Sequence, residues 1–152
     1  MKVYLGLDPG QSGGIAYITE DRSKVGAFKM PDTDQDLLDL LEDIDQMGQC
    51  HAILESVHSM PAQGVSSSFT FGEGYGKLQM ALLAMKIPFT KVSPQKWQKE
   101  MGCMSKGDKN VTKARAQELF SDWTKGSPPA IKITHATADA LLLADYGRRT
   151  LR

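Results

Sequence analysis

Three short apolar segments at the start of the chain have the composition and spacing of β-strands. They lie at residues 2–8, 14–20 and 24–30, and turn-forming residues follow each of the first two. We therefore predict three consecutive strands in a meander, with Asp8 at the end of the first.

The hydrophobic period changes after this meander. Apolar residues recur at helical spacing over 37–47 with acids on the opposite face, which predicts a helix capped by Thr33 or Asp34. An apolar run at 51–55 then predicts a fourth strand, and this strand also ends in an acid, Glu55.

The second half of the chain alternates helical and strand-like segments. Residues 56–76 are rich in Ser and Gly and predict a loop. Ser93 followed by Pro94 is typical of a helix N-cap with proline in the first helical position. The remaining predicted elements are a strand at 88–92, a short helix through Met101, and helices at 75–86, 110–121 and 135–149.

This order, β-β-β-α-β-α-β-α-α-α, favours an α/β fold with one mixed sheet and helices packed on it. It is the element order of the RNase H-like fold, in which five strands lie in the order 3-2-1-4-5. A length of 152 residues suits a single domain with one hydrophobic core, so we expect residues 1–152 to form one RNase H-like domain.

Composition narrows the class of protein. Apolar residues make up 41% and charged residues 24%, which fits a globular chain and excludes a disordered one. We find no run of 18 apolar residues and no signal-peptide pattern, so we expect no membrane association. Cys50 and Cys103 lack the spacing of a metal site, and we expect them to be reduced thiols in a cytoplasmic protein.

The formal net charge is zero, from 18 basic and 18 acidic residues, whereas many nucleic-acid-binding proteins are basic. The charges are segregated along the chain, however. Acids dominate residues 32–45 and bases dominate residues 86–132, so a neutral total is compatible with a positive face.

Three acids lie at positions typical of catalytic or ligand-binding residues. Asp8 and Glu55 end predicted strands, and ligands of open sheets collect beyond the carboxyl ends of strands. Asp139 lies early in the last helix, and His135, four residues before it, shares its helical face. Clustered carboxylates repel one another unless a cation joins them, and Mg²⁺ prefers oxygen ligands. If the acids converge, the pattern predicts metal-assisted phosphodiester hydrolysis.

Each of these residues also has a structural interpretation. An acid at a strand end is often only a cap, and His135 could cap its helix or be solvated. The glycine-rich turn after Asp8 could cradle a phosphate, but it lacks the Lys-Ser/Thr of a P-loop. A similar turn opens the sugar-kinase and actin-like ATPases, which are far longer chains.

Several segments together resemble the RuvC-type Holliday junction resolvases, most closely the short bacteriophage and chloroplast branch. They are Leu-Asp-Pro-Gly at 7–10, Ser-Gly-Gly-Ile-Ala at 12–16, Leu-Glu-Ser at 54–56 and Ala-Asp-Ala-Leu-Leu-Leu-Ala at 138–144. Residues 71–78, 92–97 and 109–120 add to the resemblance, and these middle segments are the ones specific to resolvases.

The resemblance implies an RNase H-like fold, a homodimer, dependence on Mg²⁺ or Mn²⁺, and paired symmetric nicks in four-way DNA. It assigns Asp8, Glu55 and Asp139 as catalytic metal ligands. The family commonly carries an acid or His three residues before the last of these, where this chain has Ala136. His135 is then the expected substitute as fourth ligand. For a phage-encoded member the location would be the host cytoplasm.

A resolvase also needs basic and aromatic contacts to DNA. Candidate phosphate contacts, each equally interpretable as part of a solvated face, are Lys96, Lys106, Lys109, Lys113 and Arg115, with Lys109 and Lys113 ranked first. Phe69 and Phe71 fall in the predicted Ser/Gly loop, where either ring could unstack bases at the junction centre or anchor the loop on the core. Trp97, Met101 and Trp123 are interpreted as packing residues.

A two-fold dimer would supply two equivalent sites for two matched cuts. The helix at 75–86 is apolar around much of its girth, so we expect it to be buried in the core and across a dimer interface. Two alternatives remain open: a broader nuclease of forks, flaps and other branched DNA, and a catalytically weak branched-DNA-binding protein. A nucleotide-binding protein without a P-loop is a distant third.

Overall fold

The computed structural model describes residues 1–57, 62–125 and 130–151, and at its centre is a five-stranded mixed sheet. The strands run in the order β3-β2-β1-β4-β5. β1 pairs antiparallel with β2 and parallel with β4, so the meander and the parallel half of the sheet meet at β1. The strands are β1 (Lys2–Asp8), β2 (Gly14–Thr19), β3 (Val25–Lys29), β4 (Gln49–Glu55) and β5 (Phe89–Val92).

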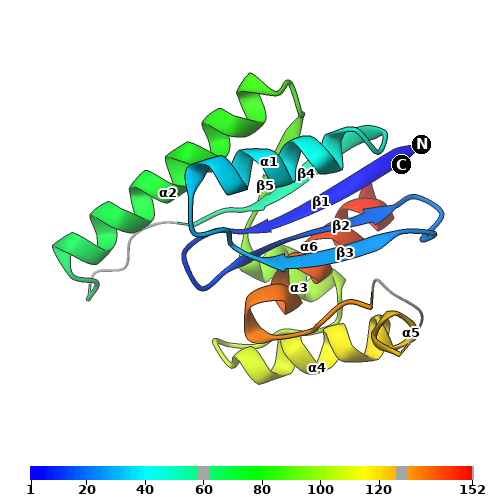
Figure 1. Ribbon diagram of the computed structural model, residues 1–152. Helices are drawn as coiled ribbons and strands as arrows, with labels where there is room; N and C mark the ends of the chain where they lie inside the picture. The colour runs from blue at the N-terminus through cyan, green and yellow to red at the C-terminus, as the bar shows by residue number, and fades with distance from the viewer. Residues whose placement is uncertain (58–61, 126–129, 152) are drawn as a thin grey trace.

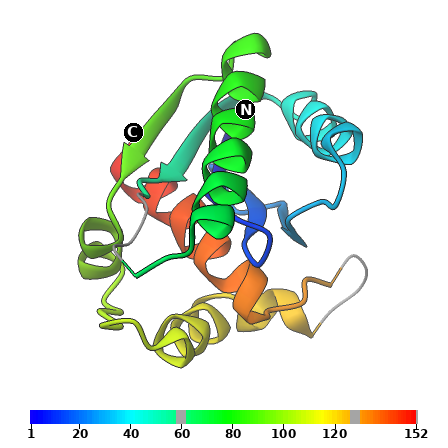
Figure 2. The same ribbon diagram turned by 90° about the vertical axis from the view of Figure 1, so that its left-hand side faces the viewer.

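Helices cover both faces of this sheet. Figure 1 shows α1 and α2 on one face, and α6 with α3 and α4 on the other, and Figure 2 shows the same molecule turned by 90°. The helices are α1 (Asp34–Asp45), α2 (Val65–Ala84), α3 (Pro94–Glu100), α4 (Lys109–Leu119), α5 (Ser121–Thr124) and α6 (His135–Thr150). Across the described residues, no helix combines the length and apolar character needed to cross a membrane.

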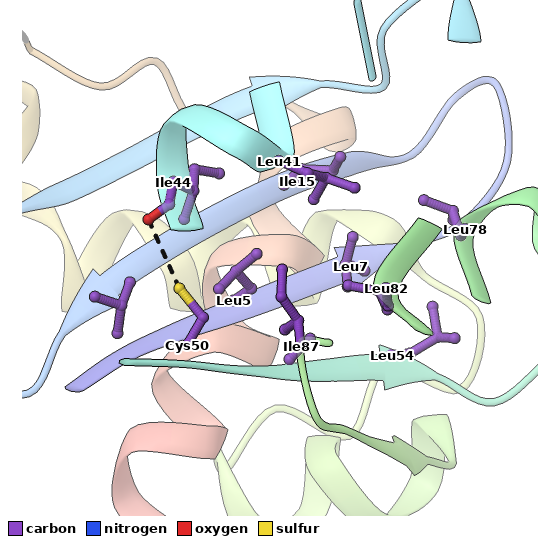
Figure 3. Packing of buried hydrophobic residues seen from close by; sticks show 12 residues of the cluster. Leu5, Leu7, Ile15, Leu41, Ile44, Cys50, Leu54, Leu78, Leu82 and Ile87 are labelled. Atoms are coloured by element: carbon purple, nitrogen blue, oxygen red, sulfur yellow. Dashed lines mark hydrogen bonds between the residues drawn. The ribbon is translucent and has the colours of Figure 1, made fainter. Parts of the chain in front are cut away.

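The alternation of side chains along the strands divides the core into two layers. Leu5 and Leu7 of β1 and Leu54 of β4 pack beneath α1 and α2, against residues such as Leu41 and Leu82 (Figure 3). The intervening positions of the same strands face α6. Asp8 and Glu55 belong to this second set, so their side chains lie on the α6 face of the sheet.

Two glycines let α6 lie directly on the sheet. A Cβ atom on Gly6 would come within 1.9 Å of the backbone oxygen of Ala140. A Cβ atom on Gly14 would come within 2.2 Å of the backbone oxygen of Ala136. Because any larger side chain would push the helix outward, these glycines set the height of α6 above β1 and β2.

The predicted fold and strand order are confirmed, and most element boundaries differ by one to three residues. Thr33 caps α1 by accepting a hydrogen bond from the Asp36 N–H, and Ser93 caps α3 ahead of Pro94. Cys50 and Cys103 are buried free thiols. The short helix α5 was not predicted.

The prediction of a loop over residues 56–76 was wrong from Val65 onward, because α2 begins there. Residues 58–61 lie outside the described part of the chain. Serine and three glycines give the first turns of α2 low helix propensity. Tertiary packing overrides this propensity, since Tyr75 and Leu78 further along the helix pack on the core and Phe71 lies against Gly10. Phe69 and Phe71 are therefore helical residues and not loop residues.

Candidate active site

Asp8 and Glu55 lie next to each other at one edge of the sheet. Leu7 of β1 is the register partner of Leu54 of β4, so the acid that follows each leucine ends its strand at the same level. Both strands run in the same direction, and both acids point toward α6. The predicted neighbourhood of these two carboxylates at the carboxyl ends of β1 and β4 is therefore present in the structure.

Asp139 reaches the same place from the first turns of α6. The helix begins in a capping box, in which Thr134 and Thr137 each bond the backbone of the other, and this fixes the start of the helix. Repulsion from Asp139 raises the pKa of both Asp8 and Glu55, which places the three acids within one electrostatic cluster. We refer to Asp8, Glu55 and Asp139 as the carboxylate cluster.

Asp8 is the most perturbed member of the cluster. Burial, followed by repulsion from Glu55 and from Asp139, together raise the pKa of Asp8 from its ordinary 3.8 to about 8. The residue is only 9% exposed, so water does little to stabilise its charged form. Without a cation nearby, this site favours a protonated, neutral Asp8.

Burial also raises the pKa of the other two acids. For Glu55, a hydrogen bond from Trp97 opposes the rise, while repulsion from Asp139 adds to it. For Asp139, the Thr112 hydroxyl, Lys109 and His135 all oppose the rise. Three acids with raised pKa values on one face form the kind of perturbed group that marks functional sites.

Lys109 provides positive charge to the whole cluster. It is the first residue of α4, whose N-cap is Asp108. Its ammonium group lowers the pKa of all three acids, Asp8, Glu55 and Asp139. Lys109 was predicted as a DNA contact, and its position beside the carboxylates gives it a second role as their counter-charge.

The donor chemistry of the cluster fits a hard divalent cation. Carboxylate oxygens are the ligands that Mg²⁺ prefers, and a cation would remove the repulsion that raises the pKa of Asp8. In their present conformations, the described residues contain no group of three or more His, Cys, Asp or Glu side chains that could hold a metal ion. The case for a metal therefore rests on donor type and mutual repulsion.

His135 lies one turn before Asp139 on α6, as the helical spacing predicted, and its positive charge would act on that carboxylate. Its Nε2 atom lies 3.1 Å from the Oδ1 of Asn110 on α4, and its side chain is exposed. Asn110 was not a predicted site residue, because no sequence pattern links it to His135. This contact orients the imidazole ring between the starts of α4 and α6.

Trp97 is a second residue of the site that sequence reasoning assigned only to packing. Its ring is fully buried, as expected, but its Nε1–H also donates to Oε2 of Glu55 at 2.8 Å. Met101 is likewise fully buried, whereas Trp123 is half-buried. Hydrophobic periodicity reports only the apolar part of a core tryptophan, so no sequence pattern indicated this contact.

The two candidate aromatic residues differ in their surroundings. The side chain of Phe69 is 71% exposed on the outer face of α2. Phe71 is half-buried, and its ring lies 3.0 Å from where a Cβ of Gly10 would be. Phe71 therefore anchors α2 on the turn that follows Asp8, and only Phe69 is free to reach outward.

The five basic candidates lie on α3, on α4 and on the connection between them, and Lys109 is the one whose charge acts on the carboxylates. Lys96, Lys106 and Lys109 are exposed, and Lys113 is half-buried. Arg115 already donates to the backbone oxygen of Met101 at 2.8 Å and pairs with Glu118 at 3.2 Å. The lysines are thus more available to a phosphate than Arg115.

A cleft of about 1120 Å³ borders the carboxylate cluster at Glu55. It is lined by the turn after β1, the connection from β3 to α1, and α2, together with Glu55 and Lys109. Among its lining residues, Lys77 of α2 pairs with Asp34 of α1 at 3.2 Å and with Glu73 at 3.1 Å. The lining of the cleft therefore combines hydroxyl groups, paired charges and the ring of Phe71.

Comparison with known proteins identifies solved structures that share this fold. No protein-family model and no curated protein matches the sequence. Among solved structures, Thermus thermophilus RuvC in complex with a Holliday junction substrate has a TM-score of 0.62 at 14% identity, covering 98% of this chain and 96% of that one. A second structure of Thermus thermophilus RuvC has a TM-score of 0.60 at 16% identity, covering 97% and 95%.

The yeast mitochondrial Holliday junction resolvase Ydc2 also matches, with a TM-score of 0.49 at 16% identity over 96% of this chain and 77% of that one. The two RuvC matches confirm the expected resemblance at the level of the fold. The same RNase H-like arrangement of five strands and flanking helices is present over nearly the whole chain.

Proposed function

We propose that this chain is a metal-dependent DNA endonuclease that resolves Holliday junctions by paired symmetric nicks. The observation that carries the proposal is the carboxylate cluster of Asp8, Glu55 and Asp139 at the carboxyl ends of β1 and β4. It lies in a fold shared with a RuvC whose structure contains a Holliday junction substrate.

Asp8, Glu55 and Asp139 would hold Mg²⁺ or Mn²⁺ through their carboxylate oxygens, with His135 as the fourth candidate ligand. Such ions, when bound, supply an activated water and stabilise the leaving oxygen of a phosphodiester. The protein itself excludes bulk water from Asp8 and orients Glu55 through Trp97. Its low-dielectric setting strengthens the attraction of the carboxylates for a cation.

Lysines around the cluster would bind the DNA backbone. Lys109 and Lys113 on α4 are the first candidates, followed by the exposed residues Lys96 on α3 and Lys106 in the α3–α4 connection. Their ammonium groups would replace counterions on the phosphates of the junction arms. This contact would direct a phosphodiester toward the carboxylates that border the cleft.

An exposed apolar stripe on α2 favours a homodimer. Its members recur every three or four residues along one face of the later turns of the helix: Gly72, Gly76, Met80 and Leu83. Met80 and Leu83 are 62% and 64% exposed, while the opposite face buries Leu78 and Leu82 in the core. The two glycines would allow close approach of a second α2, and two-fold symmetry would provide the two sites for paired nicks.

Phe69 is the better candidate for contact with bases at the junction centre. It lies in the first turns of α2, at the end of the helix that projects beyond the sheet in Figure 1, whereas Phe71 is held against Gly10. An exposed ring in this position could stack on bases that a junction leaves unpaired.

The experiment that tests the proposed function is cleavage of a synthetic four-way junction with Mg²⁺ and mapping of the cut positions. We expect symmetric nicks from the wild type, and a loss of at least about 100-fold in rate for Asp8→Asn, the size that loss of a charged catalytic group produces. Asp43→Asn, an exposed acid on α1, is the matched control and should cut normally. A wild type that never cuts, or an Asp8→Asn protein that cuts normally, would contradict the proposal.

The same assay separates the narrower function from a broader one. Junction, fork, flap and plain duplex DNA should be compared at the same salt concentration, because affinity for phosphates depends steeply on salt. Preference for the four-way junction supports resolution. Equal cutting of every branched form would instead indicate a general branched-DNA nuclease.

A further inference from the structure

A buried tryptophan joins the hydrophobic core to the carboxylate cluster. The ring of Trp97 has no exposed surface, and its Nε1–H donates to Oε2 of Glu55 at 2.8 Å. The ring packs with Ile53, Met101 and Leu142, among others, in the core layer beneath α6. One end of the side chain is therefore fixed by packing, and the other end contacts a candidate metal ligand.

Sheet register and helix capping bring the two residues together. Val92 of β5 is the register partner of Glu55, and Ser56 N–H bonds the Val92 oxygen at 2.8 Å. Ser93 then caps α3 through its hydrogen bond from the Lys96 N–H. The chain turns back at this cap, so Trp97 lies on the first turns of α3 close to the end of β4.

In this hydrogen bond Trp97 can only donate, and the Glu55 carboxylate accepts. An indole N–H is a donor only, and a buried donor without an acceptor is costly, so the ring favours one position of Glu55. The bond uses Oε2, and no other hydrogen bond to the Glu55 carboxylate is present among the described residues.

We propose that Trp97 is a positioning residue, which holds Glu55 in the orientation that binds the divalent cation and so sets the cation affinity of the site. It acts through Glu55 and has no contact with DNA. The inference rests on the proposed function, because it assumes that Glu55 is a metal ligand. Partners that orient metal ligands in this way typically change metal affinity or activity 10- to 100-fold.

The test replaces only the N–H group. Site-specific incorporation of 3-benzothienylalanine at position 97 keeps the bicyclic ring and substitutes sulfur for the N–H. Trp123 offers a matched control, since its buried Nε1 has no hydrogen-bond partner within the described residues. Circular dichroism and thermal melting of both proteins verify that the fold is kept, and binding of Mn²⁺ is then measured by titration calorimetry.

We expect Mn²⁺ affinity to fall about 10- to 100-fold for the analogue at position 97 and to stay unchanged for the analogue at position 123. Junction binding in EDTA should be the same for all three proteins. A second readout is the ¹⁵N-indole resonance of Trp97, which should move in Glu55→Gln and on addition of Mg²⁺, while that of Trp123 stays in place.

The outcomes separate the two proposals. Wild-type Mn²⁺ affinity in the folded position-97 analogue would overturn the role of Trp97 and leave the nuclease proposal intact. Failure of the wild type itself to bind Mn²⁺ would overturn both. An unchanged chemical shift of the Trp97 indole N–H in Glu55→Gln would also overturn the positioning role. The two groups would then not be in contact in solution.

Discussion

Asp8 and Glu55 end neighbouring parallel strands with both carboxylates on the α6 face of the sheet, and the charge of Glu55 adds to the rise that burial causes in the pKa of Asp8. Such an arrangement does not stabilise the folded protein by itself. Burial and repulsion both favour the neutral form of Asp8, and Lys109 offsets them only in part. The cluster therefore lowers the stability of the metal-free protein, and under the proposed function a bound cation would offset that loss.

The raised pKa of Asp8 predicts a pH-dependent stability in metal-free protein. The unfolded chain releases this proton near pH 3.8, whereas the folded chain keeps it to about pH 8. Between these values the folded state binds more protons, so the free energy of unfolding falls as pH rises, by at most about 1.4 kcal/mol per pH unit for this one group. Asp8→Asn removes this dependence. Urea unfolding in EDTA should therefore show Asp8→Asn gaining stability over the wild type steadily from pH 5 to pH 8.

Asp43→Asn is the control for that series, because Asp43 is exposed on α1 and outside the cluster. Its stability should follow the wild-type curve. Parallel curves for wild type and Asp8→Asn would mean that Asp8 titrates normally and is not buried beside other acids.

Removing Lys109 should have two effects that a surface lysine lacks. Its charge lowers the pKa of Asp8, Glu55 and Asp139, so Lys109→Gln should raise all three carboxyl pKa values, as followed by ¹³C NMR. If Lys109 also binds a phosphate, the slope of junction affinity against salt concentration should become shallower by about 1.

Lys99→Gln on α3 is the matched control, since Lys99 is exposed and is not among the charges that act on the cluster. It should leave the carboxyl titrations unchanged. Identical titrations for both variants would place the Lys109 ammonium away from the acids in solution.

The strand order and the three acids could be predicted from sequence because local patterns determine them. Short apolar segments bounded by turn residues specified the meander, Asp8 and Glu55 each end such a segment, and Asp139 lies in the first turns of the last helix. The start of α2 could not be predicted, since its helix is stabilised by Phe71 on Gly10 and by Leu78 in the core, which are contacts distant in sequence. The bonds from Trp97 to Glu55 and from His135 to Asn110 span 42 and 25 residues, and no local pattern encodes them.

A charge in the exposed stripe of α2 should prevent dimer formation. Leu83 is 64% exposed on the isolated chain, and an aspartate there would be buried against a second copy without a partner. We expect Leu83→Asp to sediment as a monomer under conditions in which the wild type is a dimer, and its paired cuts should become single nicks.

Gln46→Glu adds the same charge on an exposed residue at the end of α1 and should leave the dimer intact. Wild-type protein that sediments as a monomer at all accessible concentrations, or a Leu83→Asp protein that remains dimeric, would remove the stripe as the interface.

The position of Asp139 depends on how closely α6 approaches β1, and Gly6 determines that approach. A methyl group on Gly6 would meet the Ala140 oxygen at 1.9 Å, which is backbone and cannot rotate away. Gly6→Ala should therefore destabilise the protein by about 3 kcal/mol or more, the upper range for overpacking, and should weaken cation binding in any folded fraction because Asp139 moves with the helix.

Gly74→Ala on α2 is the opposite case, since nothing lies within 4 Å of its new methyl group, and it should stabilise the helix by up to about 1 kcal/mol. Urea unfolding of the two variants checks both signs. Equal stability of Gly6→Ala and wild type would show that α6 does not lie directly on the sheet. The packing of α6 would then not determine the position of Asp139 relative to Asp8.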